Sequence, residues 1–278
     1  MIHKTIPIWN DEREFMPTLT TYILDDCLAK ERENATPPRK RGAVLIFPGG
    51  GYYYCSPREA EPVALQFMSA GFHAFVLEYT TRNSDPNGRW PQPLLDASRA
   101  MTIIRENASK WNVDPNNIAV CGFSAGGHLA ASLGTMWNRD YIKSCPEIGD
   151  NKPNALILGY PAINPDAGPQ EYRDCFRNLS DGDVAPDMLR ELSVNLNVTP
   201  DTPPTFLWHT VEDSLVPVKN ALLFANALDE NNVSFEAHIY PYGVHGLSLG
   251  TEETGKGELH VVPHIANWIA LAIKWLKL

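Results

Sequence analysis

Short apolar runs alternate with amphipathic stretches along most of the chain. Runs of four to six residues, bounded by Gly, Pro or polar residues, predict buried strands at 43–47, 74–78, 118–121, 155–158, 205–208 and 235–239. Between and after them, helices are expected at 59–70, 94–111, 127–134, 218–228 and 261–276. Strands that alternate with helices indicate βαβ units, so we expect a mostly parallel, doubly wound sheet with helices on both faces.

Three polar segments interrupt this alternation. Residues 31–41 are predicted to form a loop between an N-terminal hairpin and the main sheet, and 80–93 a turn-rich loop. Residues 162–202 are rich in Asp, Pro and Asn and contain one predicted helix at 186–196, which is typical of a lid inserted between two strands. We therefore expect a single α/β domain over 1–278 with a lid at 162–202.

The composition narrows the class of partner. The chain has 278 residues, of which 44% are hydrophobic and 20% charged, as in ordinary globular proteins. Its 23 basic and 33 acidic residues give a net charge of −10. Such a charge disfavours nucleic acid and membrane surfaces as partners, although it also serves simply to keep a protein in solution. The oligomeric state stays open, a homo-oligomer included.

The cysteines and the N-terminus point to a reducing compartment. Five cysteines at irregular spacings show neither a CxxC pair nor a disulfide ladder. Met1–Pro7 lacks the profile of a secretory signal, and no apolar stretch is long enough to span a bilayer. The expected location is the cytoplasm, where the triplet Asn178-Leu-Ser180 would carry no glycan.

A G-x-S-x-G pattern, Gly122-Phe-Ser-Ala-Gly126, follows the strand predicted at 118–121 and opens the next helix. In a strand–turn–helix setting this pattern is the nucleophile elbow, in which a sharp turn presents the serine hydroxyl at a helix N-terminus. The alternative is a turn of small residues that only packs a helix on a strand. Ser124 is the predicted nucleophile.

A glycine triplet, Gly49-Gly50-Gly51, follows the strand at 43–47. Acyl transfer needs backbone N–H donors near the developing oxyanion, and glycines allow such amides to point into a site. Gly50, Gly51 and Ala125 are the predicted donors. A phosphate-binding or flexible loop is the alternative, but neither glycine-rich turn has the G-x-G-x-x-G spacing of a dinucleotide site.

The acid and base are expected in the chain order Ser, Asp, His. Asp213 lies in a polar turn after the strand at 205–208, where Glu212 is a rival and helix capping an alternative role. His245 lies in a glycine-flanked loop after the last strand and suits a general base.

The other histidines fit the base less well, and none predicts a metal or cofactor. We expect structural roles for His73, His128 and His238, and support of the acid loop by His209. His260 and His264 are expected on one face of the last helix, as a surface pair that no further ligands complete.

At this point the chain resembles the Aes-like and BD-FAE-like esterases of the α/β-hydrolase superfamily. The carriers are Pro48-Gly-Gly-Gly-Tyr52, Pro93-x-x-Asp96-Ala97 leading to Ile104-Arg105, Gly122–Ala130, Asp213-x-x-Val-Pro217 and Gly243-Val-His245-Gly246. The resemblance covers about 40–278 and implies the α/β-hydrolase fold and intracellular acetyl or acetylxylan esterase activity. Many relatives have His where this chain has Pro48, which puts the support of the glycine loop in doubt. Asp96 is interpreted as a helix N-cap or ion-pair partner.

Aromatic residues gather in the loops predicted near Ser124 (Tyr52, Tyr53, Tyr54, Trp90 and Tyr242). They either stack on sugars or fill the wall of the pocket and the lid, and Tyr52 and Trp90 are the predicted substrate contacts. With the resemblance, this favours hydrolysis of small acyl esters, acetyl groups on xylo-oligosaccharides above all, through an acyl-serine intermediate.

Three alternatives to this esterase stay in view. A peptidase- or formamidase-type hydrolase would share the triad. A non-catalytic relative would normally lack a triad member, and a nucleotide-binding protein would need a phosphate fingerprint.

Overall fold

A computed structural model describes residues 1–13, 15–26 and 39–278 of the chain. In this part of the chain eight strands form one sheet in the order β1-β2-β4-β3-β5-β6-β7-β8. The strands are β1 (Ile2–Pro7), β2 (Thr18–Ile23), β3 (Arg41–Phe47), β4 (His73–Glu78), β5 (Val113–Phe123), β6 (Ala155–Gly159), β7 (Thr205–Thr210) and β8 (Phe235–Tyr240). The first two pair antiparallel, β2 pairs antiparallel with β4, and all other pairs are parallel. The α/β-hydrolase fold expected from the sequence is confirmed.

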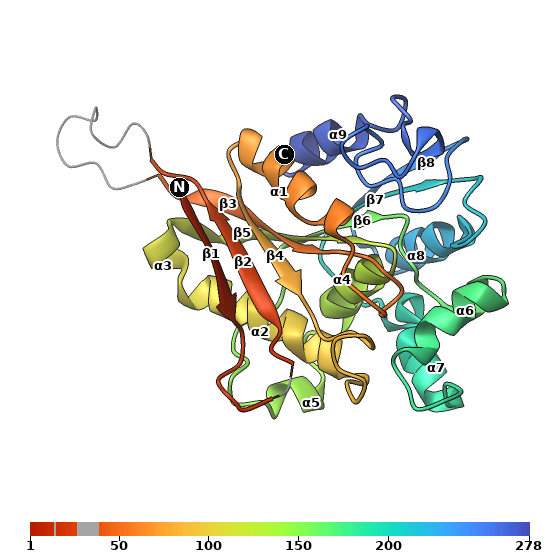
Figure 1. The fold of residues 1–278 in the computed structure, drawn as a ribbon, viewed down its shortest axis with the longest axis horizontal. Coiled ribbons are helices and arrows are strands. Elements are labelled where there is room, and N and C mark those ends of the chain that lie inside the picture. The colour runs from red at the N-terminus through yellow and green to blue at the C-terminus, as the bar shows by residue number, and fades with distance from the viewer. Residues whose placement is uncertain (14, 27–38) are drawn as a thin grey trace.

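Helices cover both faces of the sheet (Figure 1). They are α1 (Glu61–Ser69), α2 (Gln92–Glu106), α3 (Ala108–Trp111), α4 (Ala125–Met136), α5 (Asp140–Lys143), α6 (Gln170–Arg177), α7 (Pro186–Leu192), α8 (Lys219–Glu230) and α9 (Trp268–Trp275), with 3₁₀ turns at Pro57–Glu59, Pro165–Ala167, Val194–Asn197 and Glu258–His260. In the described residues no helix is long and apolar enough to cross a bilayer.

The central strands are apolar throughout because both of their faces are covered. Val44 and Ile46 pack in one core cluster with side chains of α1 and α9, whereas Leu45 and Phe47 pack in the other with α2, α4 and α8. Consecutive residues of a strand point to opposite faces, so a continuous apolar run serves both clusters.

The predicted elements differ from the observed ones chiefly at their ends. The helix expected at 94–111 is two helices, α2 and α3, and the one expected at 186–196 ends at Leu192. The last helix begins at Trp268 rather than at 261, and residues 263–267 before it form turns. The loop predicted at 31–41 lies mostly outside the described residues.

The segment predicted as a lid lies between β6 and β7. It contains α7 as expected, but also α6, which the sequence did not predict. Figure 1 shows both helices beside the carboxyl ends of the strands, where α/β proteins build their sites. We refer to residues 162–202 as the insertion.

Candidate active site

Ser124 stands on the turn between β5 and α4. Its backbone has φ 53° and ψ −120°, a strained conformation for a residue with a side chain. The turn is also tight: a Cβ added at Gly122 would lie 2.1 Å from the carbonyl oxygen of Gly126, and one at Gly126 would lie 2.1 Å from that of Phe47. Only glycine fits at these two places, so the pattern of the sequence is explained by close backbone approach.

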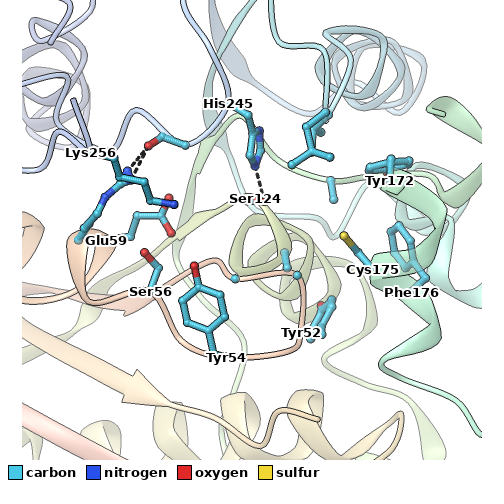
Figure 2. Close-up of a pocket in the computed structure, with 18 residues that line it drawn as sticks. Tyr52, Tyr54, Ser56, Glu59, Ser124, Tyr172, Cys175, Phe176, His245 and Lys256 are labelled. Carbon is cyan, nitrogen blue, oxygen red and sulfur yellow. Dashed lines mark hydrogen bonds between the residues drawn. The ribbon is translucent and has the colours of Figure 1, made fainter. Parts of the chain in front are cut away.

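The structure brings Ser124, His245 and Asp213 together in one line of hydrogen bonds. Ser124 Oγ lies 2.8 Å from His245 Nε2 (Figure 2). His245 Nδ1 lies 2.6 Å from Asp213 Oδ2. The other carboxylate oxygen of Asp213 accepts the N–H groups of Leu215 and Val216. Asp213 is therefore buried and held in place, and its carboxylate keeps the proton of the imidazole on Nδ1.

The rival acid does not contact His245. Glu212 is exposed, and its carboxylate accepts the N–H of Gly243 at 3.2 Å. Glu212 thus helps to hold the loop that carries His245. Asp213 does not cap a helix, since α8 begins only at Lys219. It accepts N–H groups of the turn that follows it while its other oxygen contacts His245, so one side chain makes both sets of contacts.

The loop after β3 presents the backbone amides predicted as oxyanion donors. Gly50 and Gly51 have φ of 126° and 63°, in the region that favours glycine. Both line the cavity next to Ser124, as does Ala125 at the first position of α4. Within the described residues no acceptor engages the N–H of Gly50, Gly51 or Ala125. Three free donors beside a serine hydroxyl suit a developing oxyanion.

A buried carboxylate that the sequence reasoning missed supports this loop. Glu59 is 3% exposed; one of its oxygens accepts the N–H of Gly49 at 2.8 Å and the other accepts the hydroxyl of Tyr160 at 2.6 Å. The hydroxyl of Tyr79 donates to the carbonyl oxygen of Pro48 at 2.7 Å. These contacts brace the glycine loop, so its support does not depend on a His at position 48. The only feature of the sequence that could have indicated this support is the acidic side chain of Glu59, which follows the glycine loop.

Tyr52 and His128 connect this loop to α4 and the insertion. Burial lowers the pKa of His128 to about 4, so the imidazole is neutral at pH 7. Its Nε2 lies 2.8 Å from the carbonyl oxygen of Leu192 and must donate there, so its Nδ1 accepts the hydroxyl of Tyr52 at 2.7 Å. The ring of Tyr52 is 1% exposed and lines the cavity as part of its wall.

Trp90, the other predicted substrate contact, does not line the cavity. Its ring centroid lies 6.2 Å from that of His128, and its backbone N–H donates to the carbonyl of Leu179 in the insertion. The structure therefore corrects this prediction: Trp90 packs behind the site. Of the aromatic residues singled out, Tyr52 and Tyr54 reach the cavity.

The structure also tests the positions expected for Asp96, His209, His260 and His264. Asp96 is not an N-cap, since it lies inside α2; it is fully buried, accepts from Trp9, Thr80 and Gln92, and lies 4.0 Å from Arg13. His260 and His264 do not share a helix, because both precede α9. His209 is buried beside the acid loop, and burial lowers its pKa to about 4.

A cavity of about 260 Å³ opens over Ser124 and has two unlike ends. Figure 2 shows Tyr172, Cys175 and Phe176 of the insertion on one side of Ser124, and Tyr54, Ser56, Glu59 and Lys256 on the other. The first end is lined by largely apolar side chains, and the cavity lining also includes Ala162, Leu215 and Val216. We call the two ends the apolar end and the polar end.

The sequence of the chain is similar to one protein-family model and to several known proteins. The sequence model of the BD-FAE family matches residues 32–228. The chain is 38% identical over 245 residues to endo-1,4-beta-xylanase B of Butyrivibrio fibrisolvens, covering 87% of this chain and 36% of that protein. It is 30% identical over 231 residues to the acetylxylan esterase of Xylanibacter ruminicola, covering 82% of this chain and 45% of that protein. The chain thus spans less than half the length of these two relatives.

A solved structure is similar over nearly its whole length. The acetyl ester-xyloside bifunctional hydrolase from Caldicellulosiruptor lactoaceticus has a TM-score of 0.82 and 36% identity, covering 99% of this chain and 95% of that one. Two of these three similar proteins carry the names of ester hydrolases, in line with the class of enzyme predicted from the sequence.

Proposed function

The chain belongs to the BD-FAE family, and from this premise we propose that it is a serine esterase that removes short acyl groups, acetyl above all, from sugar esters. The observation that carries the proposal is the line of hydrogen bonds from Ser124 through His245 to Asp213, at 2.8 and 2.6 Å. A hydroxyl, an imidazole and a buried carboxylate in this order have the geometry of general-base activation of a nucleophile.

In the proposed reaction His245 takes the proton of Ser124 while Oγ attacks the ester carbonyl carbon. The carbonyl oxygen becomes negative in the tetrahedral intermediate and accepts the N–H groups of Gly50, Gly51 and Ala125. His245 then gives its proton to the leaving alcohol oxygen, which leaves an acyl-serine. Water activated by the same imidazole hydrolyses that ester and releases the acid.

The two ends of the cavity suggest how an ester lies in it. The apolar end suits the acyl group, because its lining offers no charged side chain and is closed by the buried rings of Tyr172 and Phe176. The polar end suits the alcohol part. The names of the acetylxylan esterase and the acetyl ester-xyloside hydrolase support acetyl as the acyl group and a xylose-based saccharide as the alcohol.

The test compares p-nitrophenyl esters from acetate to octanoate, together with acetylated xylan, for the wild type and Ser124→Ala. We expect the highest kcat/KM on acetate and a loss of at least about 10³-fold in the variant. A preference for octanoate would contradict the short-acyl assignment. A fully active Ser124→Ala protein would contradict the mechanism.

A further inference from the structure

Two basic side chains, Arg58 and Lys256, line the polar end of the cavity and form no ion pair with an acidic residue in the described part of the chain. Lys256 is exposed, lines the cavity and, within the described residues, forms no ion pair. Arg58 also lines it, but its guanidinium donates to the carbonyl oxygens of Gly246 and Thr254 rather than to an acid. Both side chains therefore bring their full charge to this end.

The one acidic side chain in the lining is already engaged. Glu59 is almost completely buried, and its two oxygens accept from Gly49 and Tyr160. Arg58, Lys256 and Glu59 together leave one net positive charge at the cavity, in a chain whose net charge is −10. The same charges affect His260. Burial is the main cause that lowers the pKa of His260, and the charges of Arg58 and Lys256 lower this pKa further.

Ser56 adds a hydroxyl without a partner. The residue is 6% exposed and lines the cavity, yet its Oγ makes no hydrogen bond to any other described residue. Figure 2 shows Ser56 on the same side of Ser124 as Lys256, and Tyr172 and Phe176 opposite. This hydroxyl can therefore donate to an acceptor that a ligand brings into the cavity.

We propose that the polar end is a subsite for a carboxylate on the alcohol part of the ester, with Lys256 as its ionic partner and Ser56 as a hydrogen-bond donor. The proposal rests on the proposed esterase function and names its substrate class: short-acyl esters whose alcohol bears an acid group, such as an acylated uronic acid. In a strongly acidic protein a local positive site is needed to bind such an anion, because the overall field repels it.

A matched pair of acetyl esters tests the subsite. The probes are 4-acetoxybenzoate and 4-acetoxybenzamide, which differ in one charged group on the leaving alcohol. The measured quantity is the ratio of kcat/KM for the acid to that for the amide. We expect this ratio to be about fivefold lower in Lys256→Gln than in wild type, as for a part-exposed ion pair, and lower still in Lys256→Glu. The ratio of the wild type should also fall at high salt, because salt screens the charge.

Lys110→Gln, which removes an exposed lysine of α3 outside the cavity, is the control for net charge. It should leave the ratio at the wild-type value. Equal ratios in wild type, Lys256→Gln and Lys256→Glu would overturn the subsite while leaving the esterase intact.

A binding experiment separates this proposal from the esterase function. Calorimetric titration of 4-hydroxybenzoate and 4-hydroxybenzamide needs no turnover. Tighter binding of the acid to wild type, lost in Lys256→Gln and weakened in Ser56→Ala, would support the subsite even if neither ester were hydrolysed. Equal binding of acid and amide would overturn it.

Discussion

The side chain of Asn178 links the insertion to the loop that carries the proposed oxyanion donors. Its Nδ2 donates to the carbonyl oxygen of Gly51 at 2.8 Å, across 127 positions of sequence. The next residue, Tyr52, has a positive φ of 59° and is held by His128. The peptide between Gly51 and Tyr52 is thus fixed at both ends, which sets the direction of the neighbouring Gly51 N–H.

Replacement of Asn178 by Ala should affect catalysis more than stability. A neutral hydrogen bond at a part-buried place contributes about 0.5–1.5 kcal/mol, and for a chain of this size each kcal/mol lowers Tm by about 2–4 °C. Outright removal of an oxyanion donor costs about 10²–10³ in kcat. Asn178 positions a donor without being one, so we expect a loss of about tenfold in kcat with little change in KM.

The assay measures kcat and KM on p-nitrophenyl acetate, with Tm by differential scanning calorimetry. Asn197→Ala is the matched control, because Asn197 also belongs to the insertion and donates to a backbone carbonyl, that of Glu191, at 2.8 Å, but does not touch the glycine loop. Equal kcat in the two variants, or a wild-type kcat in Asn178→Ala despite a lower Tm, would refute the positioning role.

Two further predictions concern buried groups near the site. Glu59→Gln leaves one acceptor oxygen for two donors, Gly49 N–H and Tyr160 O–H. The free energy of unfolding in urea should therefore fall by about 1–3 kcal/mol. The control is Glu61→Gln, at a part-buried contact with Tyr22, which should lower the free energy of unfolding by less. Equal losses would contradict this reasoning. The pKa of His128 is about 4 in the folded protein and about 6.5 in an unfolded chain, so the unfolded state binds the proton first as the pH falls. The contribution of the neutral imidazole to the free energy of unfolding is therefore fully present above about pH 6.5. It is lost as the pH falls towards 4, by up to about 1.4 kcal/mol per pH unit. His128→Gln should flatten urea unfolding curves measured across this window, and an unchanged pH slope would contradict the assignment.

The fold and the three residues of the proposed triad could be predicted because their signals are local. A buried strand, a turn too tight for any Cβ and a helix follow one another within residues 113–136 around Ser124, so the elbow can be recognised without tertiary information. The order of Asp213 and His245 after later strands follows from the parallel sheet, whose loops meet at one edge.

What supports and shapes the site was decided by contacts between distant segments. Glu59 meets Tyr160 across 101 positions and Asn178 meets Gly51 across 127, and no periodicity in the sequence encodes such pairs. Tertiary contacts also decide the position of Trp90, which was expected at the substrate but packs near His128. The position of Lys256 at the cavity likewise depends on the path of the chain after His245. Local patterns determine which elements form, whereas packing decides which side chains share a cavity, because burial and hydrogen bonding depend on neighbours in space.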